Sequence, residues 1–206
     1  GIGLHSGKKT KIVIHPAAPN QGIHIVRTDL ADRPTLAVHY KNVLKTQLAT
    51  TIGNEHFAIG TVEHVLAALE GLGVDNALLE VDGPEVPIMD GSAEPFCDAI
   101  YAVGLETQLQ LRRYVAIRKR VELKIDEKWA VVEPASHLEV HASIDWDHPV
   151  IGYQEFVYHK GKTSFAEVSS ARTFGLLRDV EKLQKNGLAR GGSLANAVVL
   201  GDGDVL

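Results

Sequence analysis

The period of the hydrophobic residues changes along the chain, and this change most limits the fold. Residues 11–15 and 22–26 alternate roughly with a period of two, which indicates half-buried strands. Residues 61–69 instead carry apolar side chains three and four positions apart, which is the spacing of one helix face. Strands and helices that occur in separate blocks are typical of an α+β fold.

The same patterns predict the remaining elements. Further strands are expected at residues 46–52, 76–81, 114–117, 121–125, 129–133, 138–144 and 197–200. Further helices are expected at residues 95–103, 165–171 and 180–185. Thr61 is expected to cap the helix at 61–69, and Gly71 and Gly73 to end it. A boundary near residues 105–113 predicts two α+β units, at 1–107 and 113–206.

Composition excludes several classes of protein. The 206 residues carry a formal net charge of −5, which argues against bulk binding of nucleic acid, because such proteins need a basic surface. No apolar run approaches the ~20 residues of a membrane-spanning helix, so no transmembrane segment is expected. The single cysteine, Cys97, rules out a disulfide framework and fits a reducing compartment.

Glu63 and His64 form the first candidate site. A neutral imidazole binds zinc, and a neighbouring carboxylate can act as a base on the metal-bound water. Adjacent helix positions point about 100° apart, but the two side chains can still converge on one point beyond the first turn. The plain interpretation is that the Glu is exposed and the His beside it is partly buried, with no chemical role for either. For the dipeptide taken alone, this plain interpretation is favoured, because one His is not a metal site.

Three other groups have both a chemical and a plain interpretation. The Thr173 hydroxyl could donate to a developing oxyanion, or Thr173 and Phe174 could belong to a capped turn with a core Phe. Trp146, which follows Asp145, could stack on a base or sugar, or simply pack in a turn. His141 and Asp145 would share a strand face, but zinc pairs of this spacing belong on helices, so no metal pair is expected there.

Four runs cover nearly the whole chain in a fixed order. They are GIGLHSGKK at 1–9, TVEHVLAALEGLGVDNALLEVDGPEVPIMDGSAEPF at 61–96, IDWDHP at 144–149 and SARTFGLLRDVEKLQKNGLARGGS at 170–193. Together they resemble the UDP-3-O-acyl-N-acetylglucosamine deacetylase family, which performs the committed step of lipid A synthesis in Gram-negative bacteria. The second run is far longer than a short motif, which makes the resemblance specific.

The resemblance implies a fold and a reaction. The fold would be two similar β-α-α-β units packed as a sandwich, the second one incomplete, with the active site between them. A β-α-β insert near residues 179–200 would line a passage for the acyl chain. The reaction would be zinc-dependent hydrolysis of the N-acetyl group of UDP-3-O-acyl-N-acetylglucosamine, with release of acetate.

The resemblance also implies residue roles. His64 would be one zinc ligand, Glu63 the general base, and Thr173 a hydroxyl that helps to hold the oxyanion. The implied substrate-binding residues are Leu4 and His5 at the mouth of the site, Phe174 near the acyl passage, and Asp145 and Trp146 at the uridine end. The other two zinc ligands, a His and an Asp one helical turn apart, are expected beyond residue 206, so the chain alone is expected to be inactive.

The family's nucleotide-linked substrate implies a cytoplasmic protein, and we expect a monomer. The alternative is a non-catalytic relic of the same fold that binds a sugar nucleotide without metal. Glu63, His64 and Thr173 are all present, which favours the enzyme, because a pure binding protein has no chemical need for this set.

Overall fold

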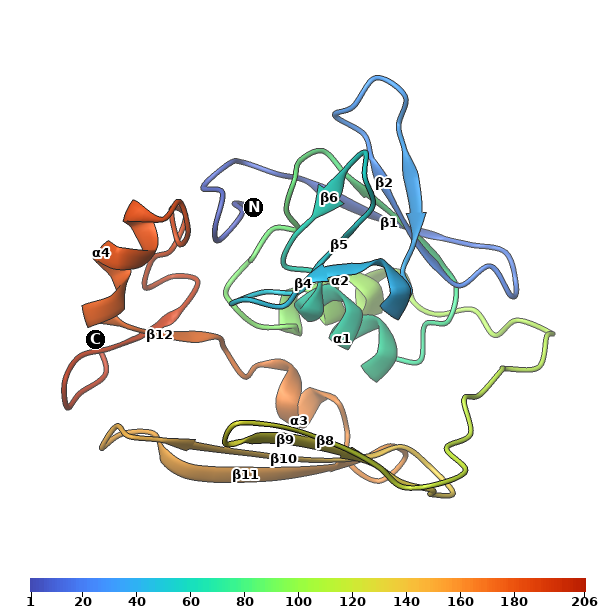
Figure 1. Ribbon diagram of the computed structural model, residues 1–206. Helices are drawn as coiled ribbons and strands as arrows, with labels where there is room; N and C mark the ends of the chain where they lie inside the picture. The colour runs from blue at the N-terminus through green and yellow to red at the C-terminus, as the bar shows by residue number, and fades with distance from the viewer. The chain divides into compact units, whose positions relative to one another are not determined.

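A computed structural model describes residues 1–206 and shows a mixed α+β protein with several small sheets and four α-helices (Figure 1). Its contacts divide the chain into two compact units, residues 1–110 together with 165–206, and residues 111–164. The predicted division at 1–107 and 113–206 is a different partition, and it stays a prediction. No helix has the length and apolar content needed to cross a membrane.

The first unit is built on a four-stranded sheet. Its strand order is β1 (Ile12–Pro16), β7 (Ala77–Val81), β2 (Ile23–Arg27) and β3 (Thr35–Ala37). β7 runs parallel to β2 and antiparallel to β1, while β2 and β3 are antiparallel. The predicted strands at 11–15, 22–26 and 76–81 are therefore confirmed to within about one residue at each end.

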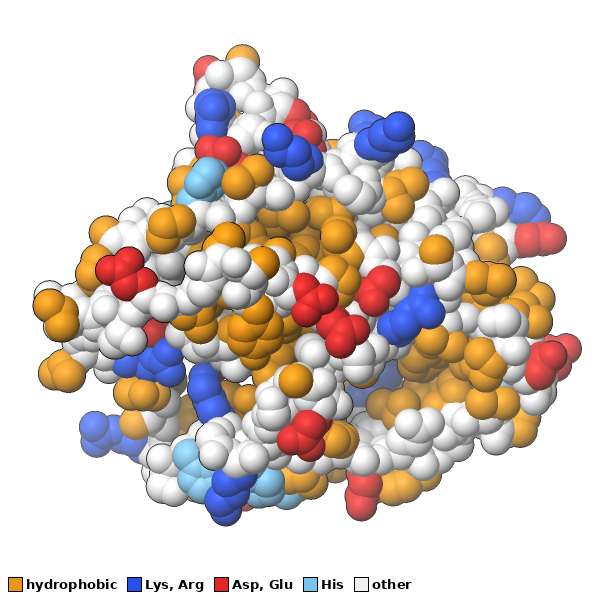
Figure 2. Space-filling model, turned by 180° about the vertical axis from the view of Figure 1, so that it is seen from behind, with side chains coloured by type: hydrophobic (Ala, Val, Ile, Leu, Met, Phe, Trp, Pro, Cys, Tyr) orange, Lys and Arg blue, Asp and Glu red, His pale blue; other side chains and the backbone are white.

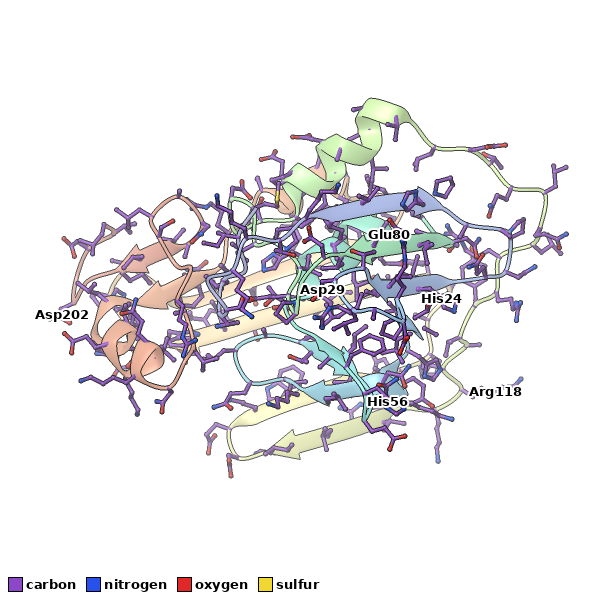
Figure 3. All side chains as sticks on the ribbon, turned by 90° about the horizontal axis from the view of Figure 1, so that it is seen from above. His24, Asp29, His56, Glu80, Arg118 and Asp202 are labelled. Atoms are coloured by element: carbon purple, nitrogen blue, oxygen red, sulfur yellow. The ribbon has the colours of Figure 1, made fainter.

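Two helices supply the other half of the core. These are α1 (Glu63–Gly71) and α2 (Glu94–Val103). Alternate residues of β7 are buried on one face of the sheet. They belong to the same hydrophobic cluster as the apolar residues that lie three and four positions apart on each helix. The shared members are Leu79 and Val81 from β7, Val65 and Leu69 from α1, and Phe96 and Ile100 from α2. The other face of the sheet carries polar groups, including His24 on β2 and Glu80 on β7 (Figure 3).

A small antiparallel sheet precedes α1. It consists of β4 (Val43–Lys45), β5 (Thr51–Gly53) and β6 (Ala58–Ile59), after a 3₁₀ turn at Tyr40–Asn42. The predicted strand at 46–52 is wrong over most of its length, because the chain bends at residues 47–49 and Leu48 adopts a left-handed φ of 61°. A continuous strand cannot pass through such a residue.

The last part of the chain returns to the first unit. A short helix α3 (Ala166–Ser169) is followed by β12 (Phe174–Leu176), α4 (Leu177–Lys185) and β13 (Val198–Leu200). β12 and β13 pair in parallel, so the segment from residue 174 to residue 200 is a β-α-β element. It begins a few residues earlier than the range 179–200 expected for the insert.

The second unit contains two antiparallel hairpins. One is β8 (Val121–Ile125) with β9 (Lys128–Val132), and the other is β10 (Glu139–Trp146) with β11 (Gly152–His159). Three of these strands were predicted, whereas β11 was missed. The predicted strand at 114–117 is wrong, because these residues form no strand.

Gly71, at the end of α1, sits directly against the ring of Phe165. A Cβ at this position would lie 2.1 Å from Phe165 Cγ, which no packed structure tolerates without movement. We expect Gly71→Ala to lower the free energy of unfolding by about 1–3 kcal/mol, the usual cost of overpacking. Chemical denaturation of the 206-residue chain measures it, with Gly203→Ala as the control, because a Cβ at Gly203 meets nothing within 4 Å. Equal midpoints for the two variants would contradict this packing.

Candidate functional site

Glu63 and His64 are the first two residues of α1. The prediction that Thr61 caps this helix is wrong, because Val62 occupies the N-cap position and no side chain caps the helix there. Thr61 instead adopts a left-handed φ of 56°, and its hydroxyl donates to Glu85 Oε1 at 2.7 Å. The hydroxyl is therefore used by a residue 24 positions away and not by the first turn of the helix.

Glu63 and His64 are both half-buried. Glu63 Oε2 accepts a hydrogen bond from the backbone N–H of Thr50 at 2.9 Å, which holds the carboxylate at the start of the helix. Burial lowers the pKa of His64, against opposing effects of the Glu63 and Asp90 carboxylates. The imidazole is thus neutral at ordinary pH, the form in which it binds a metal.

Glu85 ties the N-terminal loop to the residue before α1. Glu85 is 4% exposed, and its carboxylate accepts hydrogen bonds from His5 N at 2.9 Å, Ser6 N at 2.8 Å and Thr61 Oγ1 at 2.7 Å. Burial alone would raise the pKa of Glu85, but these hydrogen bonds together lower it, so the group is a charged, buried acceptor. No local pattern in the sequence marks Glu85 as important, because its partners are distant along the chain.

The loop at Asp90–Ser92 is hydrogen-bonded to Arg172 and Thr173, which directly precede β12. Arg172 Nε donates to Asp90 O at 2.6 Å, and Thr173 N donates to Gly91 O at 2.8 Å. Gly91 has a φ of 93°, and a Cβ there would lie 2.3 Å from Asn196 O, so only glycine permits this approach. The charge of Asp90 also opposes the lowering of the His64 pKa, so the loop acts on the imidazole electrostatically while its backbone is hydrogen-bonded to the Thr173 segment.

Leu4 and His5 contact the segment after α4. Leu4 O accepts from Gly191 N at 2.9 Å, and His5 Nδ1 accepts from Ala189 N at 3.3 Å. His5 Nε2 is buried and has no hydrogen-bond partner. Phe174 begins β12 and pairs with Val198 in β13. Thus six of the eight predicted site residues belong to the first unit.

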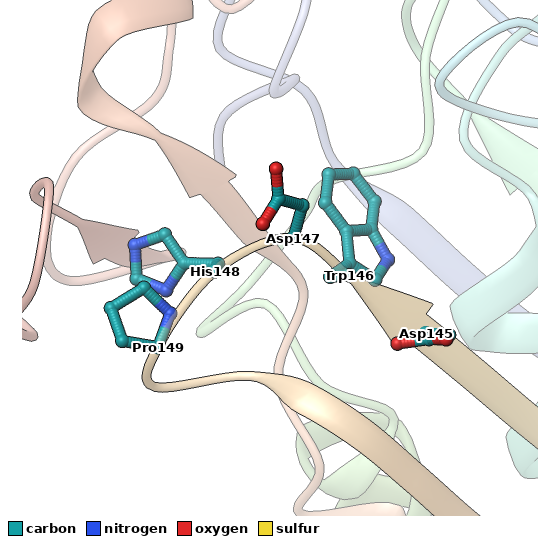
Figure 4. Close-up of a pocket in the computed structure, with 5 residues that line it drawn as sticks. All are labelled: Asp145, Trp146, Asp147, His148 and Pro149. Atoms are coloured by element: carbon teal, nitrogen blue, oxygen red, sulfur yellow. The ribbon is translucent and has the colours of Figure 1, made fainter.

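Asp145 and Trp146 belong to the second unit. They line an open pocket of about 620 Å³ together with Asp147, His148 and Pro149, at the turn between β10 and β11 (Figure 4). The turn is ordered by His148, which is 6% exposed and whose carbonyl accepts from the backbone N–H groups of Ile151 and Gly152. An exposed indole beside carboxylates can stack on a planar ring.

The donors around His64 do not complete a metal site within this chain. A catalytic zinc ion takes three protein ligands, and His64 fits as one of them because its imidazole is neutral and half-buried. The one group of three donors that lie close together is His137, Glu139 and His159, in the second unit.

Comparison with known proteins supplies the family. The family described as UDP-3-O-acyl N-acetylglycosamine deacetylase matches residues 1–206. A protein of Syntrophus aciditrophicus is 50% identical over 202 residues, covering 97% of this chain and 64% of the relative. One of Myxococcus xanthus is 48% identical over 207 residues, covering 100% and 66%. Both are named UDP-3-O-acyl-N-acetylglucosamine deacetylase, and the chain spans about two thirds of their length.

Proposed function

Since the chain belongs to the UDP-3-O-acyl N-acetylglycosamine deacetylase family, we propose that it carries part of a deacetylase of lipid A biosynthesis. The reaction is hydrolysis of the N-acetyl group of UDP-3-O-acyl-N-acetylglucosamine, with release of acetate. The observation that supports this most directly is the arrangement at the start of α1, where Thr50 N holds the Glu63 carboxylate next to a neutral, half-buried His64.

The metal of this proposal is zinc. His64 would hold it as one ligand, and the remaining two protein ligands would come from residues beyond 206 in the longer protein. When bound, zinc would polarise the amide carbonyl and lower the pKa of a water molecule. Because the chain supplies one ligand of three, we propose that residues 1–206 alone do not catalyse the reaction.

The protein's own groups perform the proton transfer and the positioning. Glu63, held by Thr50 N, takes the proton of the attacking water. The hydroxyl of Thr173, whose backbone N–H donates to Gly91 O, donates to the oxyanion that forms at the amide carbon. Both roles require the side chain to lie within hydrogen-bonding distance of the group on which it acts, the water for Glu63 and the amide oxygen for Thr173.

The remaining predicted residues bind the substrate. Leu4 and His5 lie at the mouth of the site, Phe174 contacts the acyl chain, and Asp145 and Trp146 contact the uridine end. We further propose that the longer protein consists of two similar units packed as a sandwich, with the β-α-β element lining the acyl passage. It would be a cytoplasmic monomer.

The test is acetate release from UDP-3-O-acyl-N-acetylglucosamine by the longer protein. We expect His64→Ala to lower the rate by at least about 100-fold, since even outer-shell changes at metal sites cost 10–100-fold, and to remove bound zinc. His56→Ala is the control, because His56 is an exposed residue of the same unit, with its side chain 76% exposed. An unchanged rate in His64→Ala would overturn the proposal, and binding of the sugar nucleotide without hydrolysis would favour the non-catalytic alternative.

A further inference from the structure

Three histidines surround one carboxylate at the open end of the β10–β11 hairpin. Glu139 is the first residue of β10 and lies directly opposite His159, the last residue of β11. His137 and His141 lie two residues before and two residues after Glu139, and alternate residues of a strand share one face. Histidine side chains gather in the lower part of the view in Figure 2.

The spacing of the donor atoms fits a small metal ion. Glu139 Oε2 lies 2.8 Å from His159 Nδ1 and 3.6 Å from His137 Nε2, and the three donors lie within 4.8 Å of one another. Ligand atoms at about 2.1 Å from a tetrahedral zinc ion are separated by about 3.4 Å. The two contacts to Glu139 lie on either side of that separation, so small side-chain rotations suffice.

His159 Nδ1 is shielded from solvent and lies 2.8 Å from the carboxylate of Glu139, with which it forms an ion pair when the imidazole is protonated. A shielded nitrogen of this kind is costly unless it is paired. A metal ion between the imidazole and the carboxylate would satisfy both groups at once.

We propose that His137, Glu139 and His159 form a binding site for a divalent transition-metal ion of the zinc class. Two imidazoles and one carboxylate suit Zn²⁺, Ni²⁺ or Cu²⁺ and not Ca²⁺ or Mg²⁺, which prefer oxygen ligands. The side chains are between 31% and 43% exposed, so an ion can reach the site and water can complete its coordination. The site lies wholly within the second unit and shares no residue with His64.

The backbone and a fourth histidine hold the ligands in place. Lys160 N donates to Leu138 O at 3.0 Å, and Thr163 N donates to His159 O at 2.8 Å, so both strands are fixed beside the ligands. His141 Nε2 contacts the other carboxylate oxygen, Oε1, and is therefore a positioning residue.

The experiment is a calorimetric titration of the 206-residue chain with Zn²⁺ in a His64→Ala background, which removes the ligand of the proposed catalytic site. We expect one equivalent to bind. Adding His159→Gln or Glu139→Gln is expected to weaken binding at least about tenfold, whereas adding His56→Gln, at an exposed histidine of the first unit, is expected to leave it unchanged.

Histidine resonances observed by NMR give a second readout, in which the imidazoles of His137 and His159 shift with metal and that of His56 does not. Absence of binding in the His64→Ala chain, or equal affinity in the His159→Gln and His56→Gln variants, would overturn the site. Either result would leave the proposed deacetylase function untouched, because that function is tested at His64 in the longer protein. Far-UV circular dichroism confirms that each variant is folded.

Discussion

Glu63→Gln in the longer protein is expected to lower kcat for acetate release by about 10²–10⁴-fold, the usual contribution of a positioned general base. Glutamine has the shape of glutamate and can still accept the hydrogen bond from Thr50 N, which is 2.9 Å long in the structure. It cannot take a proton from water, so the chemistry is lost while the local fold is kept. This prediction rests on the proposed function.

Zinc content separates this role from a structural one. We expect Glu63→Gln to bind zinc as the unchanged protein does, because His64 is intact, and to unfold at the same denaturant concentration. Glu70→Gln is the matched control, since Glu70 is an exposed residue of the same helix, and its kcat should not change. A Glu63→Gln enzyme within a factor of a few of the unchanged protein would remove Glu63 as the base.

Glu85→Ala is expected to lower the free energy of unfolding of the 206-residue chain by about 3 kcal/mol, since each stranded buried donor costs about 1–3 kcal/mol. Three donors lose their acceptor, namely His5 N, Ser6 N and the Thr61 hydroxyl. Thr61 is 2% exposed, so water cannot replace the lost contact there without opening the core. Urea denaturation measures the change, and Glu106→Ala, at an exposed position, is the control.

The same carboxylate makes stability depend on pH in a defined direction. The folded pKa of Glu85 is lowered from the ordinary value of 4.5. The stabilisation is therefore fully present above pH 4.5 and is lost as the pH falls through the lowered folded value. We expect the stability difference between the unchanged chain and Glu85→Ala to shrink over that acidic range. A constant difference at all pH values would mean that the charge of Glu85 is not what stabilises the loop.

Local patterns of sequence predicted most elements but not their contacts. The helices at α1 and α2 follow from apolar residues at helical spacing and from glycines that end them, and both were predicted to within about two residues. The predicted cap at Thr61 was wrong because the Thr61 hydroxyl donates to Glu85 instead. The predicted strand at 46–52 was wrong because Leu48 adopts a left-handed φ, a conformation that a leucine in the sequence does not indicate.

The candidate sites show the same limit. Glu63, His64 and Thr173 were singled out from short motifs, whereas the hydrogen bonds that join Asp90 and Gly91 to Arg172 and Thr173 could not be read from the sequence. His137, Glu139 and His141 alternate along the sequence, which is a visible signal on one strand face. His159 could not be added to them, because β11 was missed and its register places His159 opposite Glu139.

The sequence by itself determined the α+β class, the period of each main element and the residue types available for chemistry, because these depend on neighbours within one or two turns. Only the tertiary structure decided that Glu85 serves three distant donors, that residues 165–206 contact the first 110, and that His159 faces Glu139. Such contacts depend on strand register and on packing between segments far apart in the chain, and a one-residue shift in register would turn each side chain to the opposite face of its sheet.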